Sequence, residues 1–347
     1  MKKTSISQSL YGLTPEGKQV QLYTLKNNGG MEVNIITFGG IITALKVPNK
    51  HGVVKNVVLG YDTLEPYLTN PTFLGAIIGR YCNRIAKGEF SLNKTVYKLP
   101  INNGTNCLHG GNKGFDKVLW NAKTIEDIDR VGLELSYFSP DLEAGFPGNL
   151  KVTVVYTLTV NNTLEVSYKA TTDKTTVVNL TQHSYFNLSG DFSKTILDQL
   201  VMIDADAYIP INSDAIPQGN IDTVRNTPFD FRTPKKVGKD INANHDQIEK
   251  GGGFDHCWVL NHQNKHIRLA ASVHDETSGR YMEVFTDEPG VQFYTANFLD
   301  TPYKPRVALC LETQHYPDSP NQDAFPSTVL NPEETYTSHT AFKFSIK

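Results

Sequence analysis

Several features that mark exported or membrane-spanning proteins are missing from this sequence. None of its 347 residues lies in a stretch approaching the roughly 20 consecutive apolar residues that span a bilayer. The N-terminal segment MKKTSISQSLYGL carries two lysines but no apolar run behind them, and a secretory signal requires such a run. We therefore expect a cytoplasmic protein with no membrane partner.

Cysteine is scarce, and its spacing excludes the common cysteine sites. The four cysteines form no CxxC pair, so no zinc knuckle is predicted; they are Cys82, Cys107, Cys257 and Cys310. His262 and His266 lie four residues apart, but the segment between them is polar and not convincingly helical. We therefore expect reduced thiols and no bound metal ion.

Charge of one sign and the common catalytic motifs are also lacking. The net charge is -3 and no long basic block occurs, so nucleic acid is not expected as a partner. No GxSxG motif of a nucleophile elbow is present. The glycine-rich pieces HGG and KGGGF lack the lysine-serine pair or the βαβ context of a nucleotide-phosphate loop.

Helix signals are few, whereas strand signals recur along the chain. Short helices are predicted only near residues 64–68 and 241–248. With 39% hydrophobic residues the chain can build a sizeable core, and we expect an all-β protein, a large antiparallel β-sandwich forming one domain over residues 1–347. The β-type runs are 18–25, 31–38, 41–47, 53–59, 73–78, 175–180, 197–203, 256–260, 267–273, 281–286, 291–294, 307–312 and 336–346.

The clearest strand pattern lies between residues 150 and 170. Apolar residues occupy alternate positions from Leu150 to Val160, with mostly lysine and threonine between them. This period of two is typical of a strand with one face in water. Asn161 and Asn162 then form a turn signal and the alternation resumes, which predicts an antiparallel hairpin.

Five polar clusters sit beside these runs or beside glycines. Taken singly, His183 could be a buried core histidine, Arg84 a surface ion pair and His109 a turn residue, and Asp255 could cap a glycine turn. Glu312 differs, because a carboxylate at the edge of a buried strand needs partners or a solvated cleft. The clusters are GRYCNRI (79–85), NCLHGG (106–111), NLTQHSYFNLSG (179–190), GGGFDH (251–256) and LCLETQH (309–315).

A histidine and a glutamate flanked by arginine, asparagine and aspartate suit chemistry on a polyhydroxylated ligand. A carboxylate can take a proton from a hydroxyl, an imidazole can give one, and an arginine fork can hold hydroxyl oxygens. The residues alone leave open a lectin-like binding protein without catalysis. They also leave open glycoside hydrolysis by Asp255 and Glu312, and an epimerase of hexose phosphates that uses Arg80, Arg84 and Lys87.

Six motifs taken together resemble the aldose 1-epimerase (galactose mutarotase) family. They occur in the family's order and cover most of the chain, although Tyr81-Cys82 departs from the usual form of the first motif. The family's fold is a large β-sandwich, the galactose mutarotase-like supersandwich, with the sugar in a cleft on one face. The motifs are GRYCNRIAKGEF, NCLHGG, NLTQHSYFNLSG, GFDHCW, EPGVQFYTANFLD and LETQHYPDSPN.

The resemblance implies a role for each matching residue and a small aldose as the partner. Glu312 matches the general base, His183 the general acid and His109 a second histidine near the ring oxygen. The remaining matches contact the sugar: Asn83, Arg84, Tyr185, Asp255 and Gln292. The implied reaction interconverts α and β anomers through an open aldehyde and needs no cofactor, because no electrons move. A monomer or a weak homodimer is expected.

Overall fold

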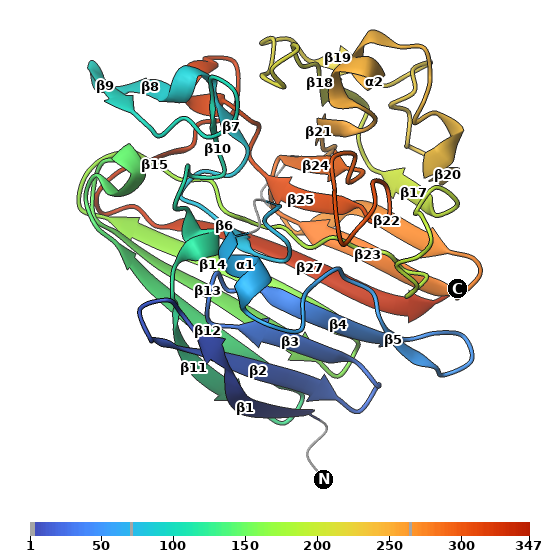
Figure 1. Cartoon of the computed structure of the whole chain (residues 1–347). Helices are drawn as coiled ribbons and strands as arrows, with labels where there is room; N and C mark the ends of the chain where they lie inside the picture. Colours follow the sequence, from blue (N-terminus) through green and yellow to red (C-terminus); the bar gives the residue numbers. More distant parts are fainter. Residues whose placement is uncertain (1–3, 70–71, 264–265) are drawn as a thin grey trace.

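The largest sheet is antiparallel and forms the broad back layer of the molecule (Figure 1). The computed structural model describes residues 4–69, 72–263 and 266–347. The sheet has nine strands among the described residues. In spatial order they are β11 (Asn121–Glu126), β12 (Arg130–Ser139), β13 (Leu150–Thr159), β14 (Thr163–Thr172), β27 (Tyr336–Ile346), β23 (Arg280–Thr286), β22 (Arg268–Asp275), β17 (Leu200–Ile203) and β20 (Lys235–Lys236).

Two smaller sheets pack on this layer, each over a different part of it. The first is built from β1 (Thr4–Leu13), β2 (Gln19–Asn27), β3 (Glu32–Ile36), β4 (Ile42–Pro48) and β5 (Val54–Asn56). The second is built from β19 (Asp222–Thr223), β18 (Ala207–Ile209), β21 (Asp255–Val259), β24 (Gly290–Tyr294) and β25 (Cys310–Gln314). One buried apolar cluster joins all three sheets, as expected for a β-sandwich.

Short pieces complete the chain between the sheets. Paired strands are β6 (Ile77–Ile78) with β16 (Thr181–Gln182), β7 (Arg84–Ile85) with β10 (Cys107–Leu108), β8 (Glu89–Leu92) with β9 (Thr95–Lys98), and β15 (Thr176–Val177) with β26 (Val329–Leu330). The α-helices are α1 (Glu65–Thr69) and α2 (Asp246–Gly251). The short 3₁₀ helices are η1 (Ala86–Gly88), η2 (Phe115–Lys117), η3 (Glu143–Gly145), η4 (Val237–Lys239) and η5 (Ser319–Asn321). No helix in the described part of the chain is long and apolar enough to cross a membrane.

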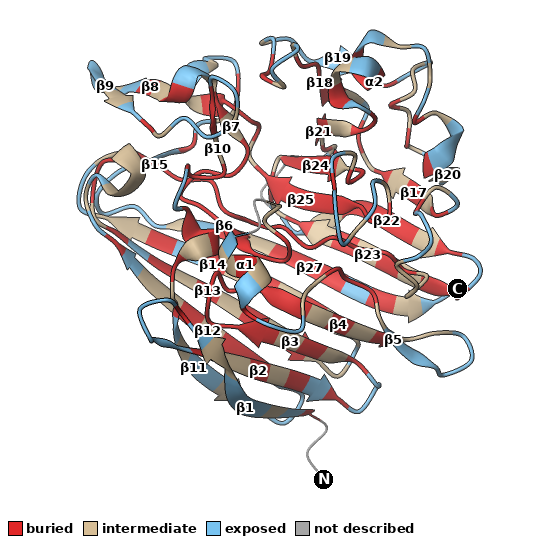
Figure 2. Ribbon diagram, in the orientation of Figure 1, coloured by how far each residue is buried: buried red, intermediate tan, exposed pale blue. Residues whose placement is uncertain are grey.

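The predicted hairpin is confirmed as β13 and β14. Leu150 pairs with Thr172 and Leu158 with Leu164, so the strands are antiparallel and in one unbroken register. The alternate residues from Leu150 to Leu158 are buried, and those between them are intermediate or exposed. Figure 2 shows the same alternation of buried and less buried residues along the strands of this sheet. The alternating apolar residues from Leu150 to Leu158 therefore face the core, whereas Val160 lies beyond the strand and is half-buried.

Two predictions about elements need correction, and several strands were not predicted. Strand β1 was not predicted, because its residues show no alternation; it stays a largely exposed edge strand paired with β2. Strands β11 and β12 were also missed. The helix predicted over 241–248 begins only at Asp246, because the His245 ring accepts the Gln247 backbone N–H and caps that end. The run 175–180 does not form one strand, since β15 ends at Val177 and β16 begins at Thr181.

Candidate active site

Three neighbouring strands, β21, β24 and β25, present polar side chains on one face. Gln292 lies directly opposite Glu312, and Cys257 lies opposite Gln292. Because residues two apart share a face, Asp255 is on this face as well. The opposite face carries Leu311 into the core. The Gln292 side chain donates a hydrogen bond to Asp255 Oδ1 at 2.7 Å, which confirms the shared face.

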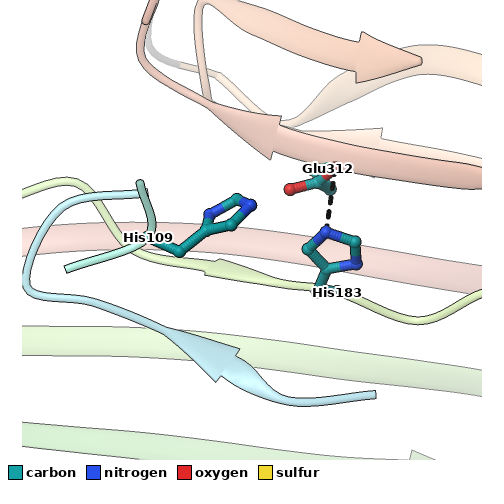
Figure 3. Close-up of side chains that lie close together, drawn as sticks. All are labelled: His109, His183 and Glu312. Carbon is teal, nitrogen blue, oxygen red and sulfur yellow. Dashed lines mark ion pairs between the residues drawn. The ribbon is translucent and has the colours of Figure 1, made fainter. Parts of the chain in front are cut away.

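The strand end that carries His183 approaches this polar face from the side of β6. The His183 backbone N–H donates to the Ala76 carbonyl, and its own carbonyl accepts the Gly75 N–H, both at 2.9 Å. The imidazole Nε2 lies 3.6 Å from Glu312 Oε1 (Figure 3). Its Nδ1 lies 3.6 Å from Cys310 Sγ. Both His183 and Glu312 are buried, at 4% and 2% exposure.

His109 is held by a sharp turn after β10. The Asn83 backbone N–H donates to His109 Nδ1 at 3.1 Å, so Nδ1 lacks a proton and the neutral ring carries it on Nε2. The ring centroids of His109 and His183 are 5.2 Å apart. The next residue, Gly110, has φ +85, and a Cβ there would lie 2.1 Å from the Gly79 carbonyl oxygen, so only glycine fits this turn.

These side chains surround a pocket of about 250 Å³. Arg84 enters it with its Nε donating to Asn103 Oδ1 at 2.9 Å. The Tyr185 ring stacks on His183, and its hydroxyl donates to the Thr72 carbonyl at 2.9 Å. The pocket is lined by Thr72, Phe73, Asn83, Arg84, Asn103, Leu108, His109, His183, Tyr185, Asp255, Tyr294, Phe298, Leu299 and Glu312.

The structure thus brings together seven of the eight predicted site residues around one pocket. Gln292 is the exception, because its side chain is turned to Asp255 and does not line the pocket. Sequence reasoning missed Phe73, whose ring contacts His109 at 4.6 Å between centroids, and Cys310 beside His183. Phe73 is apolar and Cys310 is small, and neither carries a local signal of function. Asn103, which accepts the Arg84 hydrogen bond, was missed as well, because its partner is known only from the fold.

Burial acts against charge at both histidines and both carboxyl groups of this pocket. It lowers the pKa of His183 to about 4 and that of His109 well below its ordinary value. Burial, reinforced by the nearby Asp255 charge and opposed by Arg84, raises the pKa of Glu312 well above its ordinary value. Burial also raises the pKa of Asp255, against Arg84 and the hydrogen bond from Gln292. Desolvation by itself therefore places the shared proton of the His183–Glu312 pair on Glu312.

His109, His183 and Glu312 together have the composition of a metal site. One ligand atom each from His109, His183 and Glu312 lies within 4.8 Å of the others. Two histidines and a carboxylate would suit zinc. However, the free nitrogen of His109 carries the proton, because Nδ1 accepts the Asn83 N–H, and a metal needs an unprotonated nitrogen. This tautomer suits proton transfer better than metal binding.

Comparison with known proteins agrees with this geometry. A family model described as Aldose 1-epimerase matches residues 21–343. The chain is 46% identical over 351 residues to a galactose mutarotase from Bos taurus, with 99% of each chain covered. It is 37% identical to an aldose 1-epimerase from Escherichia coli (strain K12), covering 96% of this chain and 97% of the relative. A crystal structure of a galactose 1-epimerase from Lactobacillus acidophilus NCFM superimposes with a TM-score of 0.89 at 28% identity, covering 100% of this chain and 99% of the other.

Proposed function

The chain belongs to the aldose 1-epimerase family, and on that premise we propose that it interconverts the α and β anomers of free aldohexoses such as galactose and glucose. The single observation that carries the site assignment is the separation of 3.6 Å between His183 Nε2 and Glu312 Oε1 inside the pocket. An acid and a base at this distance can reach both oxygens of one hemiacetal carbon.

In the proposed mechanism Glu312 is the base and His183 the acid. Glu312 removes the proton from the anomeric hydroxyl, and His183 donates a proton to the ring oxygen. The bond between C1 and the ring oxygen breaks, an open aldehyde forms, rotation about C1–C2 exposes its other face, and the ring closes with the transfers reversed. No cofactor takes part in this scheme, since both proton carriers are side chains.

The reactive form has its proton on His183, opposite to the preference set by burial. Arg84 favours this form, because its charge lowers the pKa of Glu312. A sugar hydroxyl that donates to the carboxylate acts in the same direction. The two forms carry the same net charge and differ only in the position of one proton between groups 3.6 Å apart.

The second histidine assists at the ring oxygen in this proposal. Since His109 Nδ1 accepts the Asn83 N–H, its Nε2–H is a donor. A neutral donor can hold the ring oxygen in place while His183 supplies the proton. Asn83, Arg84 and Asp255 bind the remaining hydroxyls, Tyr185 forms a wall of the pocket, and Gln292 acts through its hydrogen bond to Asp255.

A hexose-phosphate epimerase is not favoured, because the basic residues near the pocket are occupied elsewhere. Arg80 is buried, and its guanidinium donates to Ser139, to the Pro140 carbonyl and to the carbonyls of Pro147 and Gly148. Lys87 does not line the pocket, which leaves Arg84 as the basic side chain there. One arginine already bound to Asn103 is a weak basis for holding a dianionic phosphate.

The deciding experiment is polarimetry on freshly dissolved α-galactose and α-glucose with the purified protein. We expect the optical rotation to reach equilibrium far faster than in the spontaneous reaction, and glucose 6-phosphate to react more slowly than glucose. An unchanged rate with sugar bound in a titration would favour the non-catalytic carbohydrate-binding alternative. Release of nitrophenol from a nitrophenyl galactoside would instead indicate glycoside hydrolysis.

Three further proposals concern the protein as a whole. We propose one domain over residues 1–347, supported by an apolar cluster that includes both Tyr23 and Phe344. We propose a cytoplasmic location, supported by four buried cysteines that are all free, and no nucleic-acid or membrane partner. We propose a monomer or a weak homodimer; sedimentation at several concentrations tests this.

A further inference from the structure

Asn179 joins the three chain segments that carry the proposed acid, the proposed base and the proposed sugar-binding residues. It is fully buried and does not line the pocket. It lies between β15 and β16, where the structure breaks the strand that the sequence predicted over residues 175–180. We infer that Asn179 is a positioning residue that, through His315 and its partner Glu288, sets the separation of His183 and Glu312. This inference rests on the proposed function and deepens it.

The backbone of Asn179 holds the first segment. Its N–H donates to the Arg80 carbonyl at 3.0 Å, and its carbonyl accepts the Cys82 N–H at 2.8 Å. These two bonds form a parallel bridge with Tyr81, immediately before Asn83 and Arg84. The segment that leads to His183 is thereby tied to the segment that presents Arg84.

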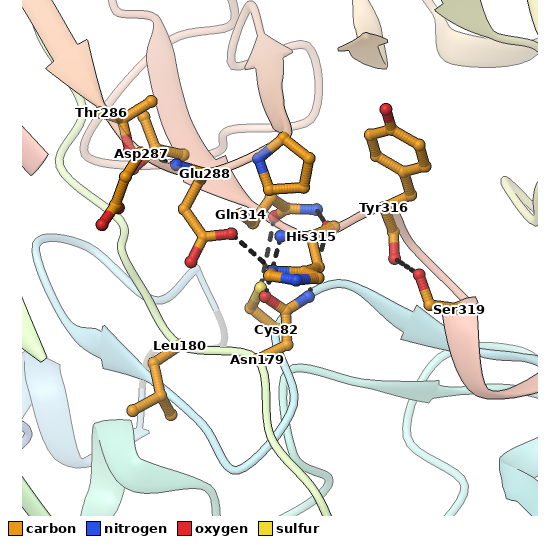
Figure 4. Close-up of polar contacts among 12 residues, drawn as sticks. Cys82, Asn179, Leu180, Thr286, Asp287, Glu288, Gln314, His315, Tyr316 and Ser319 are labelled. Atoms are coloured by element: carbon orange, nitrogen blue, oxygen red, sulfur yellow. Dashed lines mark hydrogen bonds and ion pairs between the residues drawn. The ribbon is translucent and has the colours of Figure 1, made fainter. Parts of the chain in front are cut away.

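The side chain of Asn179 holds the second segment. Its Oδ1 accepts the His315 backbone N–H at 3.0 Å, and its Nδ2 donates to the His315 carbonyl at 3.3 Å (Figure 4). The amide therefore imitates a β-bridge to the residue that follows β25. Glu312 lies in that strand, three residues before His315. We call these two hydrogen bonds the Asn179 clamp. A fully extended chain rises about 3.3 Å per residue, so the clamp lies within about 10 Å of Glu312 along the strand.

The side chain of His315 is held in turn by Glu288. His315 Nδ1 lies 2.6 Å from Glu288 Oε2, and the carboxylate is 2% exposed (Figure 4). The Tyr336 hydroxyl also donates to Glu288 Oε1, at 3.2 Å. Burial would raise the pKa of Glu288, but the His315 charge and hydrogen bond outweigh it and hold that pKa below its ordinary value. The end of β25 is thus fixed through both its backbone and its side chain.

A rigid support of this kind matters because the catalytic pair is sensitive to distance. His183 follows β16 and Glu312 lies in β25, and their side chains meet at 3.6 Å without a hydrogen bond between them. Nothing in the pair itself maintains the separation. A displacement of about 1 Å at a reacting group costs on the order of 100-fold in rate. The clamp at Asn179 restrains this displacement.

The test is Asn179→Asp, which keeps the shape and the backbone bonds but removes the Asn179 donor to the His315 carbonyl, leaving the Gln314 side-chain donor at 3.1 Å. We expect kcat for galactose to fall about 10–100-fold with KM within about twofold, because Arg84 and Asp255 keep their places. The loss should shrink as the pH falls, since a protonated carboxyl regains an O–H donor to that carbonyl. The readout is therefore the ratio of variant to wild-type kcat between about pH 8 and about pH 5.

The matched control is Asn27→Asp. Asn27 is also buried, and its side chain likewise accepts a backbone N–H, from Met31 at 3.0 Å, and donates to a backbone carbonyl, of Thr159 at 2.8 Å. It does not line the pocket. We expect both variants to lose thermal stability, because each replaces a buried amide by a carboxyl group. The control should nevertheless keep wild-type kcat at every pH.

The outcomes separate the inference from the proposed function. A folded Asn179→Asp variant with wild-type kcat, a raised KM at unchanged kcat, or an equal kcat loss in the control would overturn the inference while the wild type stays active. An inactive wild type would overturn the proposed function and this inference together. If Asn179→Asp does not fold, Glu288→Gln decides: a kcat loss at unchanged KM supports the clamp, and wild-type kcat refutes it.

Discussion

His183 Nε2 and Glu312 Oε1 approach to 3.6 Å, although His183 immediately follows β16 and Glu312 lies in the middle of β25. Both side chains are almost completely buried. A buried imidazole and a buried carboxyl at this distance share one proton, so whichever holds it is an acid and the other is a base. In the proposed mechanism the pair therefore opens and closes a hemiacetal in both directions.

Removing either member of the pair should abolish most of the activity. One general acid or base contributes on the order of 10²–10⁴-fold in rate, so Glu312→Gln and His183→Asn should each lower kcat by about that factor. The double variant should lose little more than the worse single variant, because each member needs the other. Polarimetry on fresh α-galactose measures all three.

Thermal unfolding is the control for these variants. Glu312 Oε2 is buried without a hydrogen-bond partner, so the neutral glutamine should not destabilise the fold. A Glu312→Gln protein with wild-type melting temperature and near-normal kcat would remove Glu312 from its proposed role.

The pH dependence of kcat/KM should be a bell whose limits belong to the pair. Burial lowers the pKa of His183 to about 4, so below about pH 4 both groups are protonated and no base remains. Burial raises the pKa of Glu312 well above its ordinary value, so the alkaline limb should lie far above the range of an exposed glutamate. Activity should thus be lost as the pH falls through about 4 and again as both groups lose their protons.

Initial rates across the pH range measure this profile. The alkaline limb should disappear from the residual activity of Glu312→Gln. A single limb near pH 6.5, typical of an exposed histidine, would show that burial does not control His183.

Arg84 should contribute mainly to sugar binding. Hydrogen bonds to charged groups are worth about 1.5–3 kcal/mol, so Arg84→Ala should raise KM by roughly 10–100-fold. The charge of Arg84 also lowers the pKa of Glu312, so its loss should move the alkaline limb to higher pH.

Arg84→Lys is the matched variant, because it keeps the charge but loses the Nε–H that donates to Asn103. It should raise KM and leave the alkaline limb in place. A collapse of kcat at unchanged KM in Arg84→Ala would contradict the binding role.

Asp116 should limit stability at neutral and alkaline pH. Its Oδ1 is buried without a partner beside a very small cavity lined by Tyr61, Tyr67 and Phe73, and burial raises its pKa to about 6. A carboxyl whose pKa is raised on folding favours the folded state only at low pH, and this contribution is lost as the pH rises through about 6. Asp116→Asn should therefore stabilise the protein at about pH 8 by up to about 3 kcal/mol, and not at about pH 3.5.

Melting temperatures at the two pH values test this, with the exposed Asp214→Asn as the control. An equal gain at both pH values would show that packing, and not the charge, is responsible.

Local patterns were sufficient for much of the fold. The alternation in β13 and β14 predicted both strands and their pairing, because a period of two can bury only one face of a sheet. Strand β1 escaped prediction, because an exposed edge strand is held by backbone bonds to β2 that leave no mark on its side chains. The break in the strand predicted over 175–180 escaped prediction for a similar reason. The backbone of Asn179 is bonded to Arg80 and Cys82, and the side chains around it do not reveal these bonds.

The sequence by itself determined which residue types were available for the chemistry, and the motifs around His183, His109, Arg84, Asp255 and Glu312 were sufficient to predict the family and the fold. Only the tertiary structure decided how those residues behave. It bonded the Gln292 side chain to Asp255, held the Arg80 guanidinium on carbonyls outside the pocket, and placed Cys310 and Phe73 beside the histidines. Distance, burial and proton position depend on contacts between segments far apart in the chain, and no local pattern encodes them.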